Sequence, residues 1–458
     1  MRCSCSLVSC SRCSLRIIQL CRPLEERVIS HSFHTGVSSL RGNELVKLSK
    51  VQCALCVLVS VVMVVPAGVL AGPAGKASSE KEWTLMMYWN ADNSLEFTTE
   101  FALSTWEKAL GSNSKINIVA LVDLKSVDGT WIYDIEGGVR KVVATWPEMN
   151  TSDPATLQKF VQFCMDKFPA KKTMLVLQDH GYAWMGISED ETNGDSLMPI
   201  DGIAKVLTNL KANNKGKGVD IISCDACNMA TVEIAYELRN VAPIYLASET
   251  TVPYDGFPYQ MFIDKLEVNP AMSPTELATT IVHDYVTYYS SKWDYDHIYN
   301  YQQDFATMSA FDLTKTAAMG PAFAKMTALL EPLIADNKNM VAAARGYALL
   351  GTWTNMAGYE WTPDAWTFFE GLRGMDAQLD AAISEWEMTF EAALIAEDHS
   401  SKYHDTVHGL NIHFPPSLAM YNCNGYLWER QFVYTGVGLD LVAESSWNDC
   451  LMAYFGAK

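Results

Sequence analysis

Two cysteines, Cys224 and Cys227, lie three residues apart where an apolar run gives way to an amphipathic stretch. This spacing after a strand and before a helix allows two kinds of chemistry. One is a redox dithiol, in which the helix N-terminus stabilises the first thiolate. The other is a single nucleophilic thiol, which needs a histidine to accept its proton and N–H donors to hold an oxyanion.

The surrounding residues favour the single nucleophile. Asp225 stands between the two cysteines, and a negative charge there raises thiol pKa values, which opposes redox catalysis. A zinc site would need a second ligand pair, and the remaining cysteines are too far apart in sequence to form one. A histidine is available, because His180 ends an apolar run 47 residues before Cys227. Gly181 follows it and lets the backbone N–H approach a substrate carbonyl.

The elements that must position these residues alternate along the chain. Apolar runs predict buried strands, and the stretches between them have apolar residues at helical spacing. Strands are predicted at 83–92, 116–123, 173–181, 218–227 and 241–249, with a shorter antiparallel addition at 130–138 and helices at 94–110 and 153–168. This order indicates an α/β fold with a mostly parallel sheet covered by helices on both faces. His180 and Cys227 then lie at the carboxyl ends of strands, where such sheets place their active sites.

Beyond about residue 270 the pattern changes to helices. They are predicted at 273–291, 313–337 and 376–397, and one late strand at about 408–416 is expected to return to the sheet. We therefore divide the chain into three parts. These are an N-terminal extension at 1–75, a catalytic core at 83–270 and a helical C-terminal region at 271–458.

Charge is distributed unevenly along the chain. The formal net charge is -19, and 49% of the residues are hydrophobic, which is enough for a large core. Residues 1–75 contain eight Lys and Arg against three Asp and Glu, whereas the remainder contains 26 against 50. A body this acidic repels phosphates, so we expect no nucleic-acid partner, while basic substrates are compatible.

The apolar run at 51–72 predicts a secretory signal peptide. Lys47 and Lys50 precede it, and small residues follow it. The alternative is an uncleaved membrane anchor, since the run is about 20 residues long. We expect an exported protein, either secreted, periplasmic or at the cell surface, with a membrane contact only through this segment. Seven of the twelve cysteines lie in 1–56, and the five that remain leave at least one thiol unpaired.

Five segments resemble, in order, motifs of the clostripain family of cysteine peptidases, which share a caspase-like fold. They are WTLMMYWNADNSLE, DHGYAWMG, CDACNMATVEIAYEL, ASETTVPYDGFPY and GLNIHFPPS, and the likeness covers roughly 83–458. The resemblance implies a catalytic dyad of Cys227 and His180, with the N–H groups of Gly181 and Cys227 holding the oxyanion. Cys224 departs from the family pattern, which usually has an apolar residue there.

The same resemblance implies cleavage of protein or peptide substrates after Arg or Lys. We also expect the protein to act as a monomer. Asp225 matches an acidic pocket position of the family, and Asp255 is a second candidate or, alternatively, a turn residue. A desolvated carboxylate selects basic side chains through charge-assisted hydrogen bonds.

Some relatives depend on calcium. Ca²⁺ is therefore a candidate ligand of the acidic loop that contains Asp190, Glu191 and Asp195, although a solvated loop explains it equally. Two other functions stay open. One is an inactive relative used for binding, and the other is the Cys-x-x-Cys redox protein.

Overall fold

The computed structural model describes residues 80–111, 114–290, 305–350, 361–403, 405–422 and 433–457. All of them belong to one compact unit, Gly75–Lys458. The N-terminal extension and the signal peptide predicted at 51–72 lie outside the described residues. None of the described helices is both long enough and apolar enough to cross a membrane.

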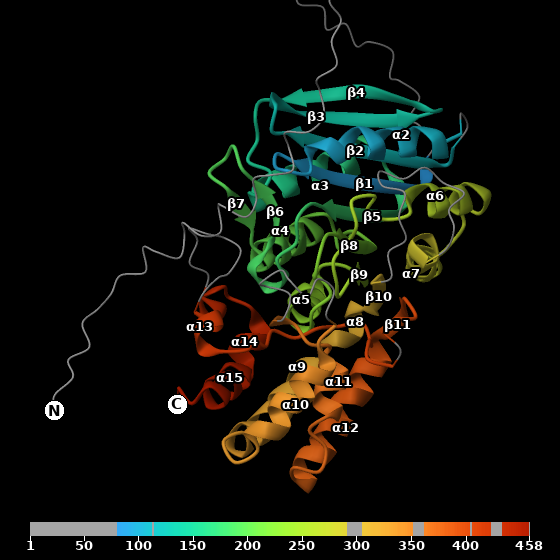
Figure 1. The fold of residues 1–458 in the computed structure, drawn as a ribbon. Coiled ribbons are helices and arrows are strands. Elements are labelled where there is room, and N and C mark those ends of the chain that lie inside the picture. The colour runs from blue at the N-terminus through green and yellow to red at the C-terminus, as the bar shows by residue number, and fades with distance from the viewer. Residues whose placement is uncertain are drawn as a thin grey trace, which may run out of the picture. The chain divides into compact units, whose positions relative to one another are not determined.

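A nine-stranded sheet forms the centre of the unit (Figure 1). The strand order is β11-β10-β9-β8-β5-β1-β2-β3-β4. The strands are β1 (Lys81–Ala91), β2 (Ile116–Leu124), β3 (Val127–Glu136), β4 (Val139–Trp146), β5 (Ala170–Gln178), β8 (Ile221–Asp225), β9 (Ile244–Ala247), β10 (Thr307–Asp312) and β11 (Leu394–His399). The five central strands pair in parallel, and both edges are antiparallel. The α/β class and the mostly parallel core expected from the sequence are confirmed.

Helices cover both faces of this sheet because its strands are apolar on both sides. On β1, Leu85 and Met87 face one buried cluster, while Met86 and Tyr88 face the other. The first face is covered by α2 (Thr99–Ala109), α6 (Tyr259–Val268) and α7 (Pro274–Ser290). The second is covered by α3 (Pro154–Lys167), α4 (Ile200–Asn213) and α5 (Val232–Glu237).

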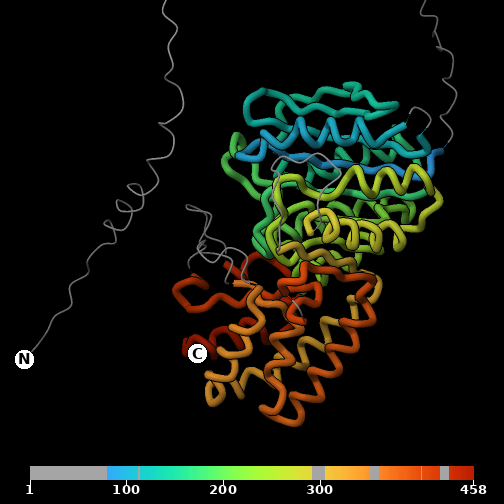
Figure 2. Tube along the Cα trace, turned by 45° about the vertical axis from the view of Figure 1, so that its right-hand side comes forward, coloured from blue at the N-terminus to red at the C-terminus, as the bar shows by residue number. Residues whose placement is uncertain are grey.

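The C-terminal region adds more helices to the second face. They are α8 (Leu313–Thr316), α9 (Met319–Leu330), α10 (Lys338–Ala348), α11 (Ala365–Glu370), α12 (Ala377–Ala393), α13 (Leu418–Tyr421), α14 (Asp440–Glu444) and α15 (Trp447–Phe455). Figures 1 and 2 place the orange and red helices beside the β10–β11 edge, away from β4 at the other edge. Because β10 and β11 belong to the same sheet, the sheet extends past residue 270, where the sequence suggested a boundary.

The late strand differs from the expectation. Residues 408–416 are extended but join no sheet, and Asn411 forms only single bridges with Thr231 and Asp364. The strands that extend the sheet are instead β10, a segment to which the sequence analysis assigned no element, and β11, which overlaps the end of the helix predicted at 376–397. Pro415 and Pro416 explain part of the difference, because proline has no N–H to donate to a ladder.

Candidate active site

His180 lies two residues beyond the end of β5. Its Nε2 is 2.9 Å from the Ser94 hydroxyl, in the loop that follows β1, and its backbone N–H donates to the Asp179 side chain. The ring is half-buried. Burial lowers the pKa of His180, and the nearby Glu189 and Glu191 carboxylates oppose this shift. The imidazole is therefore neutral at neutral pH, which is the form that can accept a proton.

Cys227 lies two residues beyond the end of β8, the strand beside β5. Asn228 follows it with φ +57°, a left-handed conformation that turns the chain sharply. The Asn228 N–H donates to Thr250 O at 3.0 Å, and the Val252 N–H donates to Cys227 Sγ at 3.4 Å. Burial raises the pKa of the Cys227 thiol to about 11, so the resting side chain is a protonated thiol.

Cys224 lies inside β8 and takes no part in this arrangement. Its buried thiol accepts a hydrogen bond from Tyr245 at 3.8 Å, and burial raises its pKa to about 12. Both Cys224 and Cys227 are free thiols. Cys224 is buried inside β8 and does not line the cavity that Cys227 lines, so the structure gives the Cys-x-x-Cys redox interpretation no support.

Gly181 is the residue at which the two strand ends meet. A Cβ added to it would lie 2.3 Å from the Cys227 carbonyl oxygen and 2.9 Å from the Met229 side chain. No side chain fits there, so glycine allows the two backbones to touch. Gly181 also faces Ile187, the first residue of the small β6 (Ile187–Asp190) and β7 (Ser196–Met198) hairpin, and the Tyr182 N–H donates to Gly186 O. In this pairing the Gly181 N–H points away from Ile187.

One cavity of about 370 Å³ is lined by His180, Gly181, Asp225 and Cys227. Four of the five predicted site residues therefore meet in one place. The segment after β9, including Val252 and Pro253, lines the same cavity. A concave site with few polar groups and an apolar lining is typical of substrate-binding clefts.

Asp225 contributes a buried carboxylate to the lining of this cavity. One carboxylate oxygen accepts hydrogen bonds from the Tyr259 hydroxyl at 2.6 Å and the Phe257 N–H at 3.1 Å. The other oxygen, Oδ1, is buried and has no partner among the described residues. A Cβ on Gly256, whose φ is +69°, would lie 2.4 Å from this carboxylate. Burial raises the pKa of Asp225 to about 6, and the two hydrogen bonds limit the rise.

Asp255 does not line this cavity. It is buried, accepts a hydrogen bond from the Tyr288 hydroxyl at 3.3 Å, and lines a separate small pocket with Phe101 and Tyr259. The next residue, Gly256, packs against the Asp225 carboxylate, but the Asp255 side chain lines the other pocket.

Several cavity residues were missed by the sequence analysis. Asp179 is buried and accepts a hydrogen bond from Asn93 at 2.7 Å, and burial raises its pKa well above the ordinary value. Trp184, Trp361 and His413 form another wall. His413 belongs to the quoted GLNIHFPPS segment, yet nothing in its spacing indicated that it would approach Cys227, 186 residues earlier.

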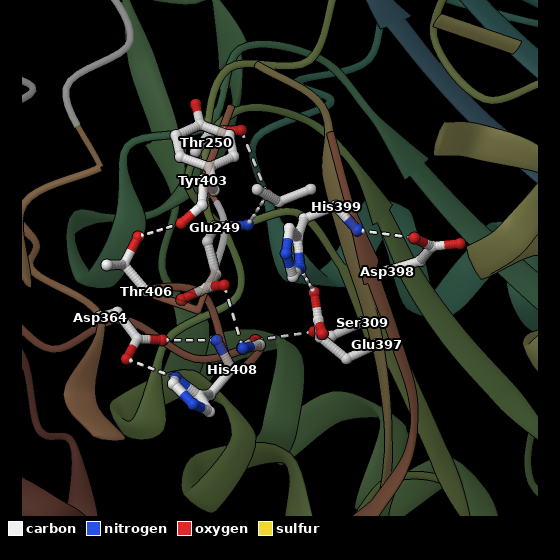
Figure 3. A network of polar contacts seen from close by, with 12 residues as sticks. Glu249, Thr250, Ser309, Asp364, Glu397, Asp398, His399, Tyr403, Thr406 and His408 are labelled. Atoms are coloured by element: carbon white, nitrogen blue, oxygen red, sulfur yellow. Dashed lines mark hydrogen bonds and ion pairs between the residues drawn. The ribbon is translucent and has the colours of Figure 1, made fainter. Parts of the chain in front are cut away.

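A buried polar network holds the loop after β9 in place (Figure 3). The Gly409 N–H donates to Glu249 Oε2 at 3.0 Å, and the Asn411 amide donates to Glu249 O at 2.6 Å. Asp364 accepts from the His408 N–H at 2.9 Å and caps α11 through the Thr367 N–H at 2.7 Å. These bonds tie the C-terminal region to the segment that runs beside Cys227.

The environment of Glu249 within this network favours its protonated form. Burial raises its pKa well above the ordinary value, and the carboxylates of Asp364 and Glu397 add to the shift. Nearby, His399 contacts Glu397 at 2.7 Å, and its backbone N–H donates to Asp398 at 2.9 Å.

In the acidic loop that the sequence suggested as a calcium site, two of the carboxylates already contact other residues of the protein. Asp190 accepts from the Thr151 N–H at 2.8 Å, and Glu191 pairs with Lys125. The carboxylates that do converge are Asp92, Asp123 and Glu148, which supply oxygens within 4.8 Å of one another. Burial raises the pKa of Asp123 to about 8, and the Glu148 carboxylate adds to the rise. An oxygen-only donor set of this kind suits a hard cation such as Ca²⁺.

A sequence profile of the clostripain family matches residues 87–409. The chain belongs to the clostripain family. Clostripain of Hathewaya histolytica is 26% identical over 220 residues, which cover 40% of this chain and 42% of that protein. The chain therefore matches less than half the length of this curated relative.

Two solved structures share the fold. One is a secreted C11 cysteine protease from Bacteroides thetaiotaomicron in complex with an irreversible peptide inhibitor, with TM-score 0.56 and 19% identity over 78% of this chain and 99% of that one. The other is an inactive zymogen C11 protease from Parabacteroides distasonis, with TM-score 0.55 and 19% identity over 74% and 93%. At this identity the likeness establishes the caspase-like fold of this clostripain-family chain.

Proposed function

We propose that this clostripain-family protein is a cysteine endopeptidase in which Cys227 is the nucleophile and His180 the general base. The observation that supports this most directly is the contact of Gly181 with the Cys227 backbone, which brings the two strand ends into one cavity. Membership of the clostripain family and a fold shared with C11 cysteine proteases agree with it.

The resting pair is uncharged, so proton transfer accompanies attack. Ser94 occupies His180 Nε2, which leaves Nδ1 to accept the Cys227 proton. The sulfur then bonds to the substrate carbonyl carbon, and its oxygen becomes an oxyanion held by the N–H groups of Gly181 and Cys227. His180 returns the proton to the leaving amine as the C–N bond breaks. Water, deprotonated by His180, then hydrolyses the thioester and restores the thiol.

The free oxygen of Asp225 supports a preference for Arg or Lys before the scissile bond. A buried carboxylate with one unpartnered oxygen is stabilised by a cationic side chain that brings N–H donors to it. Asp255 lies in a different pocket, so we assign this role to Asp225 and leave Asp255 as a structural neighbour of Tyr288.

We further propose that the protein is exported and acts as a monomer. The apolar segment at 51–72, with lysines before it and small residues after it, supports export. The Bacteroides relative is described as secreted. All the residues assigned to the reaction come from one chain, so a second copy is not needed to complete the site.

The test is an assay of residues 76–458 with reductant present. Reporter peptides that place Arg, Lys, Asp or Leu before the scissile bond are compared for the wild type, Cys227→Ala and Cys224→Ala. We expect turnover of Arg and Lys peptides that is abolished by Cys227→Ala and retained by Cys224→Ala. If Cys224→Ala abolished turnover and Cys227→Ala did not, the nucleophile would be Cys224 and the proposed assignment would be wrong. No turnover of any peptide, even after limited proteolysis and added Ca²⁺, would favour an inactive binding protein.

A further inference from the structure

The ring of His413 forms part of the cavity wall that is made by the C-terminal region. The residue is 2% exposed, and neither ring nitrogen has a hydrogen-bond partner among the described residues. Its backbone is fixed on both sides, because its N–H donates to Glu233 at 2.9 Å and its C=O accepts from the Trp447 indole at 2.9 Å. A buried polar ring that is held in place without partners is costly unless a ligand supplies them.

Aromatic rings surround this histidine. The ring centroid of His413 lies 4.6 Å from Tyr434, 5.1 Å from Trp184 and 6.4 Å from Trp361. Trp184 and Trp361 also line the cavity. Burial lowers the pKa of His413 to about 3, and the nearby Arg345 guanidinium adds to this effect. The imidazole is therefore neutral and offers one hydrogen-bond donor and one acceptor.

The aromatic wall and Asp225 lie toward opposite faces of the sheet. Asp225 is bonded to Phe257 and Tyr259, which belong to the core cluster under α6 and α7. Trp184 belongs to the cluster on the other face, and Tyr434, beside His413, belongs to it as well. Cys227, just beyond the carboxyl end of β8, lines the same cavity as both, so a peptide bound at Cys227 with one side chain against Asp225 can place its other half beside the aromatic wall.

The position of Trp184 identifies which half of the substrate peptide lies beside the aromatic wall. Trp184 follows His180 by four residues, in the 3₁₀ turn η2 (Ala183–Met185). In the proposed mechanism His180 gives its proton to the leaving amine, so the leaving half of the substrate lies beside His180 and this turn.

Resting on the proposed peptidase function, we propose that His413, Trp184 and Trp361 form a second specificity subsite. It takes the residue that follows the scissile bond and selects an uncharged aromatic side chain with a hydrogen-bonding group, as in tyrosine. The indole rings contact the face of the aromatic side chain. A nitrogen of the His413 ring forms a hydrogen bond with the phenol hydroxyl of the substrate tyrosine. A phenylalanine after the scissile bond leaves the His413 ring without this hydrogen bond.

The same chemistry excludes charged residues. No carboxylate lines this wall among the described residues, so a lysine or arginine there would lose hydration without gaining an acceptor. A neutral imidazole supplies no positive charge for an aspartate or glutamate, and the nearby Arg345 is not among the residues that line the cavity. The cavity thus selects a cation on the Asp225 side and an uncharged ring on the His413 side.

The test uses internally quenched peptides with Arg before the scissile bond and Tyr, Phe, Lys or Asp after it. The readout is the ratio of kcat/KM for the Tyr and Phe peptides in one enzyme preparation, so the amount of folded enzyme cancels. We expect the wild type to favour Tyr over Phe by about fivefold to tenfold, the size of one net hydrogen bond. His413→Phe should bring the ratio close to one, and His413→Gln, which keeps a donor and an acceptor, should restore part of it.

His283→Phe is the matched control, because this exposed histidine pairs with Asp398 away from the cavity and should leave the ratio unchanged. A wild-type ratio near one overturns the subsite even if the His413 variants fail to fold. So does a Tyr preference that survives His413→Phe. Failure to cleave any Arg peptide contradicts the proposed function itself, whereas cleavage of all of them at equal rates contradicts only this subsite.

Discussion

The two walls of the cavity are built in different ways. The reacting wall consists of residues at the ends of adjacent parallel strands, where Gln178 of β5 pairs in register with Asp225 of β8. The other wall is an irregular ladder, in which the Phe414 N–H donates to Trp361 O at 2.6 Å and the Ile412 N–H donates to Pro363 O at 3.0 Å. Regular strands fix the relative position of reacting groups within narrow limits, while the irregular ladder carries Trp361 and His413 of the proposed subsite.

The strand-end wall should tolerate almost no added volume. Gly181→Ala forces a Cβ against the Cys227 carbonyl oxygen at 2.3 Å, so one backbone must move and the oxyanion donor moves with it. We expect kcat/KM to fall by at least about 10²-fold, the cost of losing one such donor. Gly346→Ala in α10 is the matched control. Among the described residues outside its own helix backbone, nothing lies within 4 Å of its Cβ, and the substitution should leave activity unchanged and stabilise the helix by about 0.5–1 kcal/mol.

Thermal unfolding together with peptide turnover checks this pair of variants. Equal activity of Gly181→Ala and the wild type would show that the contact between the two strand ends is not needed for catalysis. Equal loss of activity in both alanine variants would point to a general effect on folding.

Substitution of two buried carboxylates tests whether Asp225, at the end of β8, determines specificity. Asp225→Asn removes the charge that a basic side chain would meet, and we expect kcat/KM for Arg peptides to fall about 10²-fold. Asp255→Asn keeps the contact with Tyr288 and should change it less than about threefold, because Asp255 lines a separate pocket. Steady-state kinetics on Arg and Leu peptides measure kcat/KM for both variants. A larger loss of Arg-peptide turnover in Asp255→Asn than in Asp225→Asn would make Asp255 the specificity residue.

The same contrast explains what the sequence could and could not predict. Buried strands are continuous apolar runs, so β1, β2, β5, β8 and β9 were found, and parallel topology then put His180 and Cys227 at one edge. β10 and β11 are both short. β11 begins at Leu394, directly after the 17-residue helix α12, and its residue types are like those of the helix, so no local signal marks where the helix ends and the strand begins. His413 and Trp361 reach the cavity through tertiary contacts, which the order of the motifs does not encode.

Substitutions in the network that supports the irregular ladder should change the free energy of unfolding more than they change activity. Asp364→Asn weakens the cap on α11 and the bond from the His408 N–H, and should lower the free energy of unfolding by about 1–2 kcal/mol. Glu249→Gln should be nearly neutral near pH 4, because burial raises the pKa of Glu249 and both the folded and the unfolded chain then carry the protonated acid.

The pH dependence of Glu249→Gln has a definite sign. A carboxyl whose pKa is raised in the fold stabilises it fully below the unfolded pKa, and this contribution is lost as pH rises toward the folded value. The wild type should therefore lose stability relative to Glu249→Gln as pH rises above about 4.3, the pKa of glutamate in the unfolded chain. Urea unfolding of both proteins between pH 4 and 8 measures the difference. A constant difference across this range would mean that Glu249 has an ordinary pKa.

The smallest expected effect is a pH dependence specific to basic substrates. Burial raises the pKa of Asp225 to about 6, so its carboxylate gains a proton as pH falls through 6 and no longer attracts a cation. Between pH 7 and 5, kcat/KM for an Arg peptide should fall about tenfold more than for a Leu peptide. Taking the ratio of the two peptides removes the contribution of His180, whose titration affects both. The loss should appear in KM, because Asp225 binds the side chain and takes no part in bond breaking, and in Asp225→Asn the ratio should no longer depend on pH.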